Sequence, residues 1–217
     1  MNRHLEHLLG RLYDGALDGE HLAELRDKSG LATEMIHAQL IRSVPPAMIP
    51  RLLGFDVPGI RSALLFPFRS PVGGFMDHVR VKVFPPLTDH EGHTVKYLQP
   101  RGSSPRLYFV ATVLHRVTEG VEPLWAVEGE KKAMAVAQLG LPAVGFCGVE
   151  GWHVRGSRDL LPDFDAIPLD GRIVEVVPDG DFQDNPQVRR AVRAFGRALA
   201  ARGARPRAVI LPRELPR

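Results

Sequence analysis

The sequence predicts an α/β protein whose C-terminal half forms a doubly wound, mostly parallel sheet. Two observations lead to this fold class. From Leu124 onward, short apolar runs alternate with amphipathic segments, which is the pattern of β–α–β units. Between Ile60 and Val110, short strand-like runs are bounded by proline and glycine, and the run at 78–84 alternates polar and apolar residues, which is typical of a half-buried antiparallel strand. We therefore expect a helical N-terminus and a small antiparallel sheet (α+β), followed by the α/β domain.

The N-terminal part of the chain is expected to be helical. Leucines recur at helical spacing through residues 1–43, and Pro45 and Pro46 end the last helix before one more short turn at 47–53. Pro85 and Pro86 are expected to end the second of the strands that follow. These predicted strands lie at residues 62–68, 78–84, 94–98 and 106–110. The three predicted parts of the chain are a helical N-terminal region (1–58), a small basic antiparallel sheet (59–118) and the α/β domain (119–217).

The α/β domain is predicted to be built from strands that are joined by helices. The strands are expected at residues 124–128, 143–146, 172–178 and 207–211, and the helices at 131–139 and 186–202. Gly140 follows the first helix, at a place where glycine commonly ends helices. Trp152 follows a glycine-rich loop near the edge where the strands end, where it would either stack on a base or lie in the core.

The composition is that of an ordinary globular protein and excludes several classes. Hydrophobic residues make up 44% of the chain, and no apolar run approaches the ~18 residues that a membrane span needs. The N-terminus lacks the apolar core of a secretory signal. Cys147 is the only cysteine, which excludes disulfides within the chain and a cysteine-based zinc site. We expect a cytoplasmic protein with no membrane partner.

Acidic residues follow two of the predicted parallel strands. Glu128 ends one strand, and Asp179 and Asp181 flank Gly180 after another. Residues i and i+2 of an extended segment point to the same side, so the two aspartates can address one point. Carboxylate oxygens are ligands that Mg²⁺ prefers, and open α/β sheets bind ligands at the carboxyl ends of their strands. The pattern predicts a site for Mg²⁺ (or Mn²⁺) made by Glu128, Asp179 and Asp181, with an ordinary polar turn as the alternative.

Basic residues gather in the predicted antiparallel sheet and close to the acids. Tyr97 and Tyr108 are interleaved with those of the sheet, and charge combined with aromatic faces holds single strands without reading their sequence. Lys131 and Lys132 begin the helix after Glu128, where they would meet a phosphate or offset the acids. The residues predicted to bind nucleic acid are Arg80, Lys82, Lys96, Arg101, Arg106, Lys131, Lys132 and Arg189. For each of them, a solvated surface charge is the alternative.

The net charge of +3 is mild, but the positive charges are unevenly distributed. The segment from Pro186 to Arg217 contains nine arginines and a single acidic residue, Glu214. Such an excess favours a polyanionic partner, and a solvated arginine-rich helix is the alternative.

Three segments, in this order, carry a resemblance to a known family. They are Val127–Ala133, Ala143–Gly145 with Gly148, and Asp179–Asp181. Together they resemble the TOPRIM domain, the catalytic fold shared by bacterial-type primases, topoisomerases and some nucleases. The resemblance is closest to the TOPRIM-like domain of plasmid, phage and integrated-element replication proteins, which is often fused to helicases. The block of predicted strands before Leu124 is also similar, so the resemblance covers about residues 60–212.

The resemblance implies both a reaction and roles for residues. It makes Glu128 a general acid or base and the pair Asp179 and Asp181 metal ligands, while Asn185–Pro186 and Arg189 match a helix start in the replication subgroup. It implies Mg²⁺-dependent, primase-like nucleotidyl transfer in mobile-element (plasmid or phage) replication. The implied partners are single-stranded DNA or RNA, nucleotides and a replicative helicase. The alternatives are a metal-dependent TOPRIM nuclease and a non-catalytic module that binds single strands or docks a helicase.

The sequence departs from the family pattern in three places. Lys132 stands where many primases have aspartate, although the replication subgroup tolerates lysine there. Topoisomerases carry a further acid two residues after the aspartate that matches Asp181, and its absence here argues against a topoisomerase. The chain ends at Leu211–Arg217, where the replication subgroup would continue with a Gly-Leu-Asp-Asp-like segment. We therefore expect a truncated chain or a divergent short member.

Overall fold

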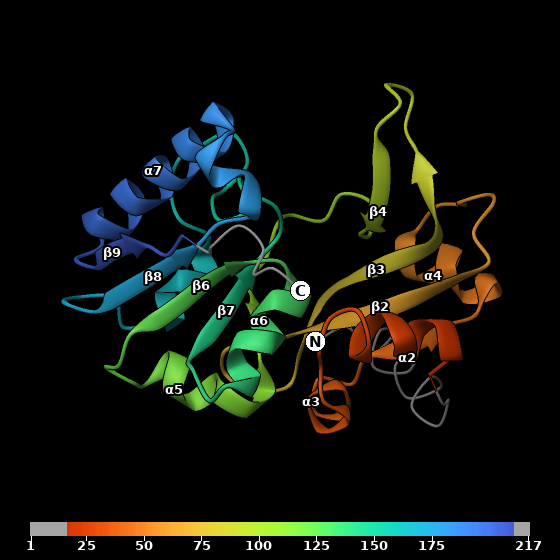
Figure 1. Ribbon diagram of the computed structural model, residues 1–217, viewed down its shortest axis with the longest axis horizontal. Helices are drawn as coiled ribbons and strands as arrows, with labels where there is room; N and C mark the ends of the chain where they lie inside the picture. The colour runs from red at the N-terminus through yellow and green to blue at the C-terminus, as the bar shows by residue number, and fades with distance from the viewer. Residues whose placement is uncertain (1–16, 211–217) are drawn as a thin grey trace. The chain divides into compact units, whose positions relative to one another are not determined.

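The computed structural model describes residues 17–210, and the helical segment predicted near the N-terminus, up to residue 16, lies outside the described residues. The chain forms two compact units, 1–103 and 104–217. Figure 1 shows an antiparallel sheet in the first unit and a mostly parallel sheet in the second. The predicted fold class, a mixed α/β protein with these two kinds of sheet, is confirmed. The division into three parts at residues 58 and 118 stays a proposal about which segments fold independently.

The first unit is a four-stranded antiparallel sheet with short helices. The strands, in their hydrogen-bonded order, are β1 (Arg42–Val44), β2 (Ser62–Arg69), β3 (Phe75–Thr88) and β4 (Thr94–Leu98). The helices are α2 (Gly19–Arg26), α3 (Thr33–Ala38), the 3-10 turn η1 (Pro46–Met48) and α4 (Ile49–Leu53). Strands β2 and β4 lie where short runs bounded by proline and glycine predicted them, so local sequence is sufficient for these strands.

Two details of this sheet correct the sequence prediction. Residues 42–44 were expected at the end of a helical region, but they form β1, in which Ser43 lies opposite Leu64 of β2. Three residues are too few to show a period, so only the partner strand defines this one. Pro85 and Pro86 do not end β3; instead, its register with β4 is irregular between Lys82 and Leu87, where prolines offer no N–H to the ladder.

Helices cover both faces of the antiparallel sheet. On one face, Val44, Leu65 and Val81 pack in a core with Leu52 and Leu53 of α4. On the other face, α2 lies against β2 and β3. The His21 ring of α2 lies 4.6 Å from the Phe84 ring, its Nε2 is 3.0 Å from Ser62 Oγ, and Glu24 of the same helix forms an ion pair with Lys82. The centre of the sheet therefore has no solvent-facing side among the described residues.

His21 gives this unit a predicted dependence of stability on pH. Its side chain is fully buried, and Nδ1 is 2.7 Å from Ser43 Oγ. Burial lowers the pKa of His21 below its ordinary value, and the nearby carboxylate of Asp18 opposes that shift only in part. The unfolded chain therefore binds a proton more readily than the folded chain, so the free energy of unfolding falls as the pH drops below about 6.5.

We expect this loss of stability to be smaller in His21→Gln than in the unchanged protein. Urea denaturation at about pH 7.5 and about pH 5.5 measures both free energies of unfolding, and carboxylates that titrate in the same range contribute equally to the two proteins. An equal loss in both proteins would assign the acid sensitivity to groups other than His21.

The second unit is a five-stranded sheet in which one edge strand is antiparallel. The strands, in their hydrogen-bonded order, are β5 (Tyr108–Phe109), β7 (Ala143–Phe146), β6 (Leu124–Glu128), β8 (Ile173–Val177) and β9 (Arg205–Ala208). The four strands from β7 to β9 are parallel, and β5 runs antiparallel to β7. The helices are α5 (Leu114–Thr118), α6 (Glu130–Gln138) and α7 (Pro186–Ala201), with 3-10 turns η2 (Ala111–Val113), η3 (Pro162–Ala166) and η4 (Gly180–Gln183).

Strand β5 corrects a third prediction. Residues 106–110 were expected as the last strand of the small antiparallel sheet, yet Tyr108 and Phe109 pair with Gly145 and Val144 of β7. Both residues are fully buried. A strand of two apolar residues has no exposed face, so its sequence carries no alternation from which a sheet could be assigned.

The start of helix α7 and its packing against the second unit both follow from features of its sequence. The Asn185 side chain accepts hydrogen bonds from the N–H groups of Gln187 and Val188, and Pro186 fills the first helical position. The buried residues of the helix recur with helical spacing and are Val188, Ala191, Val192, Phe195 and Leu199. The Trp152 ring stacks on Phe195 with a centroid distance of 5.1 Å and is fully buried, so of its two predicted roles the structure supports the core.

Within the described part of the chain, no helix is both long enough and apolar enough to cross a membrane.

Candidate active site at the carboxyl edge of the parallel sheet

The turn from β6 into α6 holds Glu128 at the edge of the sheet. Gly129 follows it with φ +96°, a conformation that L side chains rarely adopt, and caps α6. The Gly129 N–H donates to the Phe146 carbonyl at 2.8 Å. A Cβ on Gly145 would stand 3.1 Å from the Gly129 carbonyl oxygen, so β7 approaches this turn closely because residue 145 has no side chain. The half-buried Glu128 is therefore fixed by two glycines and two neighbouring strands.

Asp179 reaches the same edge from the adjacent strand. Strands β6 and β8 are parallel, with Val127 opposite Val177, so Glu128 and Asp179 both follow the last paired positions. The Asp179 carboxylate forms an ion pair with the ammonium group of Lys132, in the first turn of α6. Both side chains of this pair are about half exposed, at 52% for Lys132 and 44% for Asp179. Lys132 thus offsets the acid, which is one of the two roles predicted for it.

A second acid of the β6–α6 turn points into the protein. Glu130 is buried, and the Cys147 thiol donates to its Oε1 at 3.4 Å. The sequence separates these residues by 17 positions, and nothing in their spacing predicts the contact. Glu130 is thus buried whereas Glu128 is half-buried, although the two residues flank the same glycine.

The carboxylates fit a hard cation by their chemistry. Asp179 is accessible and already attracts a positive group, and both Asp179 and Glu128 offer the oxygen ligands that Mg²⁺ prefers. Among the described side chains, no group of three or more His, Cys, Asp or Glu residues could hold a metal ion. The side chain of Asp181 lies outside those described. Convergence of Glu128, Asp179 and Asp181 on one ion is therefore a proposal.

Lys82 and Arg106 correct the predicted basic surface. Lys82 was expected on the outward side of the antiparallel sheet, but it is buried beneath α2 and paired with Glu24, because α2 covers the face on which it lies. Arg106 is part of the second unit: its Nε donates to Asp163 Oδ2 at 2.9 Å, and the Leu107 N–H donates to the same oxygen at 2.8 Å. Asp163 is buried, so Arg106 anchors a loop inside this unit.

The other basic residues of the antiparallel sheet do not share one face. The Arg80 guanidinium lies 4.8 Å from the centre of the Tyr97 ring. Lys96 is exposed and precedes Tyr97 in β4, so alternation directs it to the opposite face. Arg101 is exposed and lies 5.7 Å from the centre of the Phe55 ring. Arg80 therefore joins its charge to Tyr97, one of the two aromatic residues predicted to take part in strand binding.

Two further predicted residues lie near the edge that carries the acids. Lys131 is half-buried in the first turn of α6, beside Lys132. The Arg189 Nη1 donates to the Gln183 carbonyl at 2.6 Å and so ties the start of α7 to the turn that follows Asp179. The sequence prediction named only Arg189 individually and counted the arginines farther along α7 as part of an excess of positive charge, although a helical wheel of residues 186–201 would have placed them on one stripe.

Comparison with known proteins places the fold. Residues 115–216 match the model of a family described as a domain of unknown function, DUF3854. No curated protein is significantly similar to this sequence.

Three solved structures are similar to almost the whole chain. The DnaG catalytic core has 20% identity and a TM-score of 0.60, with 96% of this chain and 71% of that chain covered. The DnaG primase catalytic domain bound to ssDNA has 20% identity and a TM-score of 0.57, covering 96% and 72%. The zinc-binding and RNA polymerase domains of Aquifex aeolicus primase have 13% identity and a TM-score of 0.67, covering 96% and 54%. These likenesses support the predicted primase-like TOPRIM fold.

Proposed function

We propose that the protein is a primase-like nucleotidyltransferase of mobile-element replication, which acts on single-stranded DNA or RNA with nucleotides as substrates and Mg²⁺ (or Mn²⁺) as cofactor. One observation carries the proposal: a chain with the fold of primase catalytic cores ends two adjacent parallel strands in acids, Glu128 and Asp179. That edge is where open α/β sheets bind ligands. A replicative helicase is the further partner that we propose, on the resemblance of residues 60–212 to helicase-fused replication proteins.

Each residue of the edge has a proposed part in this reaction. Glu128 acts as general acid or base or as a metal ligand, and its half-buried position limits its contact with water. Asp179 and Asp181 hold the cation, which when bound would neutralise charge on phosphate oxygens. Lys132 keeps Asp179 neutralised before the cation enters, and Lys131 beside it attracts a phosphate. Arg80 and Tyr97, which belong to the first unit and not to this edge, have the proposed part of holding the single strand by charge and stacking.

A second candidate function rests on the ion pair between Lys132 and Asp179. An acid that is already paired with an internal cation needs no metal, and the protein would then be a non-catalytic module that binds single strands or docks a helicase. Thermal stability in the presence of metal separates the two functions without relying on activity.

We expect Mg²⁺ or Mn²⁺ to raise the melting temperature of the unchanged protein but not that of Asp179→Asn. A ligand that binds only the folded state stabilises it by about 2.7 kcal/mol at 100 times its Kd, which is readily measured. Lys132→Gln should respond at lower metal concentrations, because the metal no longer displaces an ammonium group from Asp179. Differential scanning fluorimetry across a metal titration measures all three responses.

The control for this titration is Glu119→Gln, which removes an exposed acid that precedes β6, whereas Glu128 lies at the other end of that strand. It should respond to metal as the unchanged protein does. Equal responses of Asp179→Asn and the unchanged protein would reject the metal site and favour the non-catalytic module. An extension assay with labelled single strand and nucleotides then separates primer synthesis from cleavage, the nuclease alternative.

A further inference from the structure

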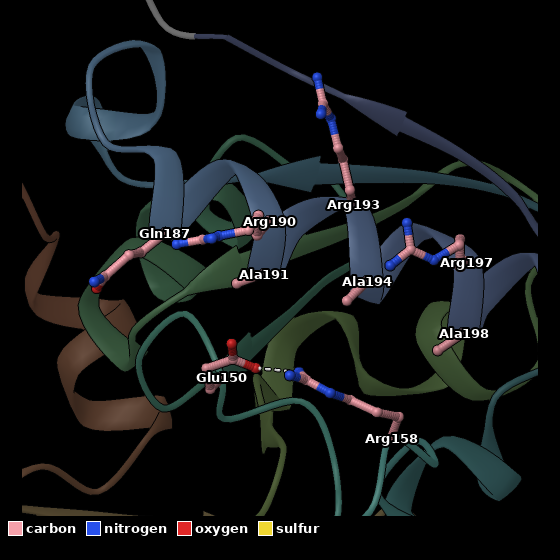
Figure 2. Close-up of a pocket in the computed structure, with 9 residues that line it drawn as sticks. All are labelled: Glu150, Arg158, Gln187, Arg190, Ala191, Arg193, Ala194, Arg197 and Ala198. Atoms are coloured by element: carbon pink, nitrogen blue, oxygen red, sulfur yellow. Dashed lines mark hydrogen bonds and ion pairs between the residues drawn. The ribbon is translucent and has the colours of Figure 1, made fainter.

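A groove of about 780 Å³ runs along one side of α7. Its floor on the helix is made of small side chains, and its opposite wall is the loop that carries Glu150 and Arg158 (Figure 2). The floor residues are Ala191, Ala194 and Ala198. Because alanine leaves space that a longer side chain would fill, the groove lets a partner approach the helix closely. This groove, called the α7 groove below, lies within the second unit and apart from the acids of the β6–α6 turn.

Three arginines form a stripe along the rim of the α7 groove. Arg190, Arg193 and Arg197 are three and four residues apart and therefore lie on one side of the helix. All three are exposed, and none of them forms an ion pair with a described residue. Figure 2 shows Arg193 directed away from the loop, so the stripe faces solvent as well as the groove. At a rise of about 1.5 Å per residue, the stripe is about 10 Å long.

The one acid on the opposite wall is paired with basic side chains of the same loop, so the wall adds little negative charge to the groove. Arg158 Nη1 donates to Glu150 Oε2 at 2.9 Å, and His153 Nε2 lies 3.0 Å from the same oxygen. Glu150 is the single acid among the described residues that line the groove, against four arginines. The lining therefore has an excess of positive charge that favours an anion.

Two features indicate which anion the groove fits. A nucleotide usually binds with Mg²⁺, which needs carboxylate ligands, and the single lining carboxylate is already bonded to Arg158 and His153. A single strand needs aromatic faces on which its bases stack, but Trp152, within this loop, is fully buried against Phe195. A duplex stacks its own bases and offers, on each strand, one phosphate per about 3.4 Å of its helix axis, so a stripe of about 10 Å that runs along that axis spans about three of them.

We propose that the α7 groove binds the phosphate backbone of a nucleic-acid duplex, with Arg190, Arg193 and Arg197 contacting successive phosphates of one strand. The groove is thereby distinct in ligand from Arg80 and Tyr97, which combine charge with stacking and suit a single strand. That the duplex is a template paired with its product rests on the proposed function; the binding of a duplex backbone does not. The base sequence of the duplex should not affect its affinity for the groove, since these contacts reach phosphates only.

Fluorescence anisotropy with a labelled RNA–DNA hybrid and the matching labelled single strand tests the proposal, in EDTA and without nucleotides. We expect Arg190→Gln/Arg193→Gln/Arg197→Gln to weaken binding of the hybrid by about 10-fold or more at moderate salt, and to reduce the slope of log K against log salt by about 3. Its affinity for the single strand should change by less than about 3-fold. The matched control, Arg26→Gln/Arg51→Gln/Arg61→Gln, removes three exposed arginines from the first unit and should leave hybrid binding within about 3-fold.

Ala194→Glu keeps the test decisive if the triple variant folds poorly. It leaves every arginine in place and puts a carboxylate on the half-exposed floor of the groove, so it should weaken binding of the hybrid as well. No binding of the hybrid by the unchanged protein, an equal loss for both probes, or an equal loss in the control would overturn the proposal. Because metal and nucleotides are absent, a failure of primer synthesis does not affect this measurement.

Discussion

Glu128→Gln is expected to lower the rate of primer synthesis by about 100-fold or more, the usual contribution of a positioned general acid or base. Glutamine has nearly the same size and can still form hydrogen bonds, so the β6–α6 turn, held by Gly129 and Gly145, should not rearrange. The substitution removes the negative charge and the ability to accept a proton. The measurement is the initial rate of extension on a labelled single strand with saturating nucleotides and Mg²⁺.

Two comparisons make this result specific. Glu119→Gln, which removes an exposed acid of the same unit, should retain the rate of the unchanged protein. Binding of the single strand by Glu128→Gln should be unchanged in EDTA, because Arg80 and Tyr97 belong to the other unit. A rate for Glu128→Gln within about 3-fold of the unchanged protein would remove Glu128 from the proposed chemistry, since a general acid or base contributes far more than that.

The sequence predicted the parallel sheet well because its signals are local. The strand at 124–128 matches β6, since an apolar run that stops at Glu128 and the glycine directly after it define where the strand ends. The capped start of α7 at Asn185 and Pro186 is equally local. The acids of Glu128 and Asp179 then share an edge by topology alone, because parallel neighbours end on the same side.

What the sequence did not predict depends on contacts between distant segments. Strands β1 and β5 are too short to show a period, and each is defined by its partner strand. The burial of Lys82 is a second case, because alternation along β3 makes its face look solvated. The signal for its cover lies elsewhere: His21, Glu24 and Leu25 recur at helical spacing in α2 and all three are buried, so this helix buries a polar stripe.

The α7 groove could not be predicted from the number of arginines in the C-terminal segment. The excess of arginine after Pro186 predicted a polyanionic partner, but a count cannot say which arginines act together. Once the segment is a helix, Arg190, Arg193 and Arg197 form one stripe, whereas Arg189 faces the turn before the helix and Arg207 pairs with the buried Glu175. The same residue type thus has three different environments within about twenty positions of the chain.

Glu24→Leu is expected to lower the free energy of unfolding by about 3–5 kcal/mol, because it leaves the ammonium of Lys82 buried without its partner. Only 11% of the Lys82 side chain and 7% of the Glu24 side chain are exposed, so water cannot replace the lost pairing. Lys82→Met should cost less, since Lys28 Nζ lies 3.7 Å from Glu24 Oε2 and still offsets the remaining acid. Urea denaturation followed by circular dichroism measures each free energy.

The double variant Glu24→Leu/Lys82→Met separates the structural role of Lys82 from a role in binding nucleic acid. Replacing a whole buried ion pair by apolar side chains is often neutral or stabilising, so the double variant should recover most of the stability that Glu24→Leu loses. If Lys82 serves only α2, this folded double variant binds the single strand as tightly as the unchanged protein does. If a fully stable double variant bound the single strand more weakly, Lys82 would be part of the surface that binds nucleic acid. Helix α2 would then have to move away from Lys82 when the strand binds.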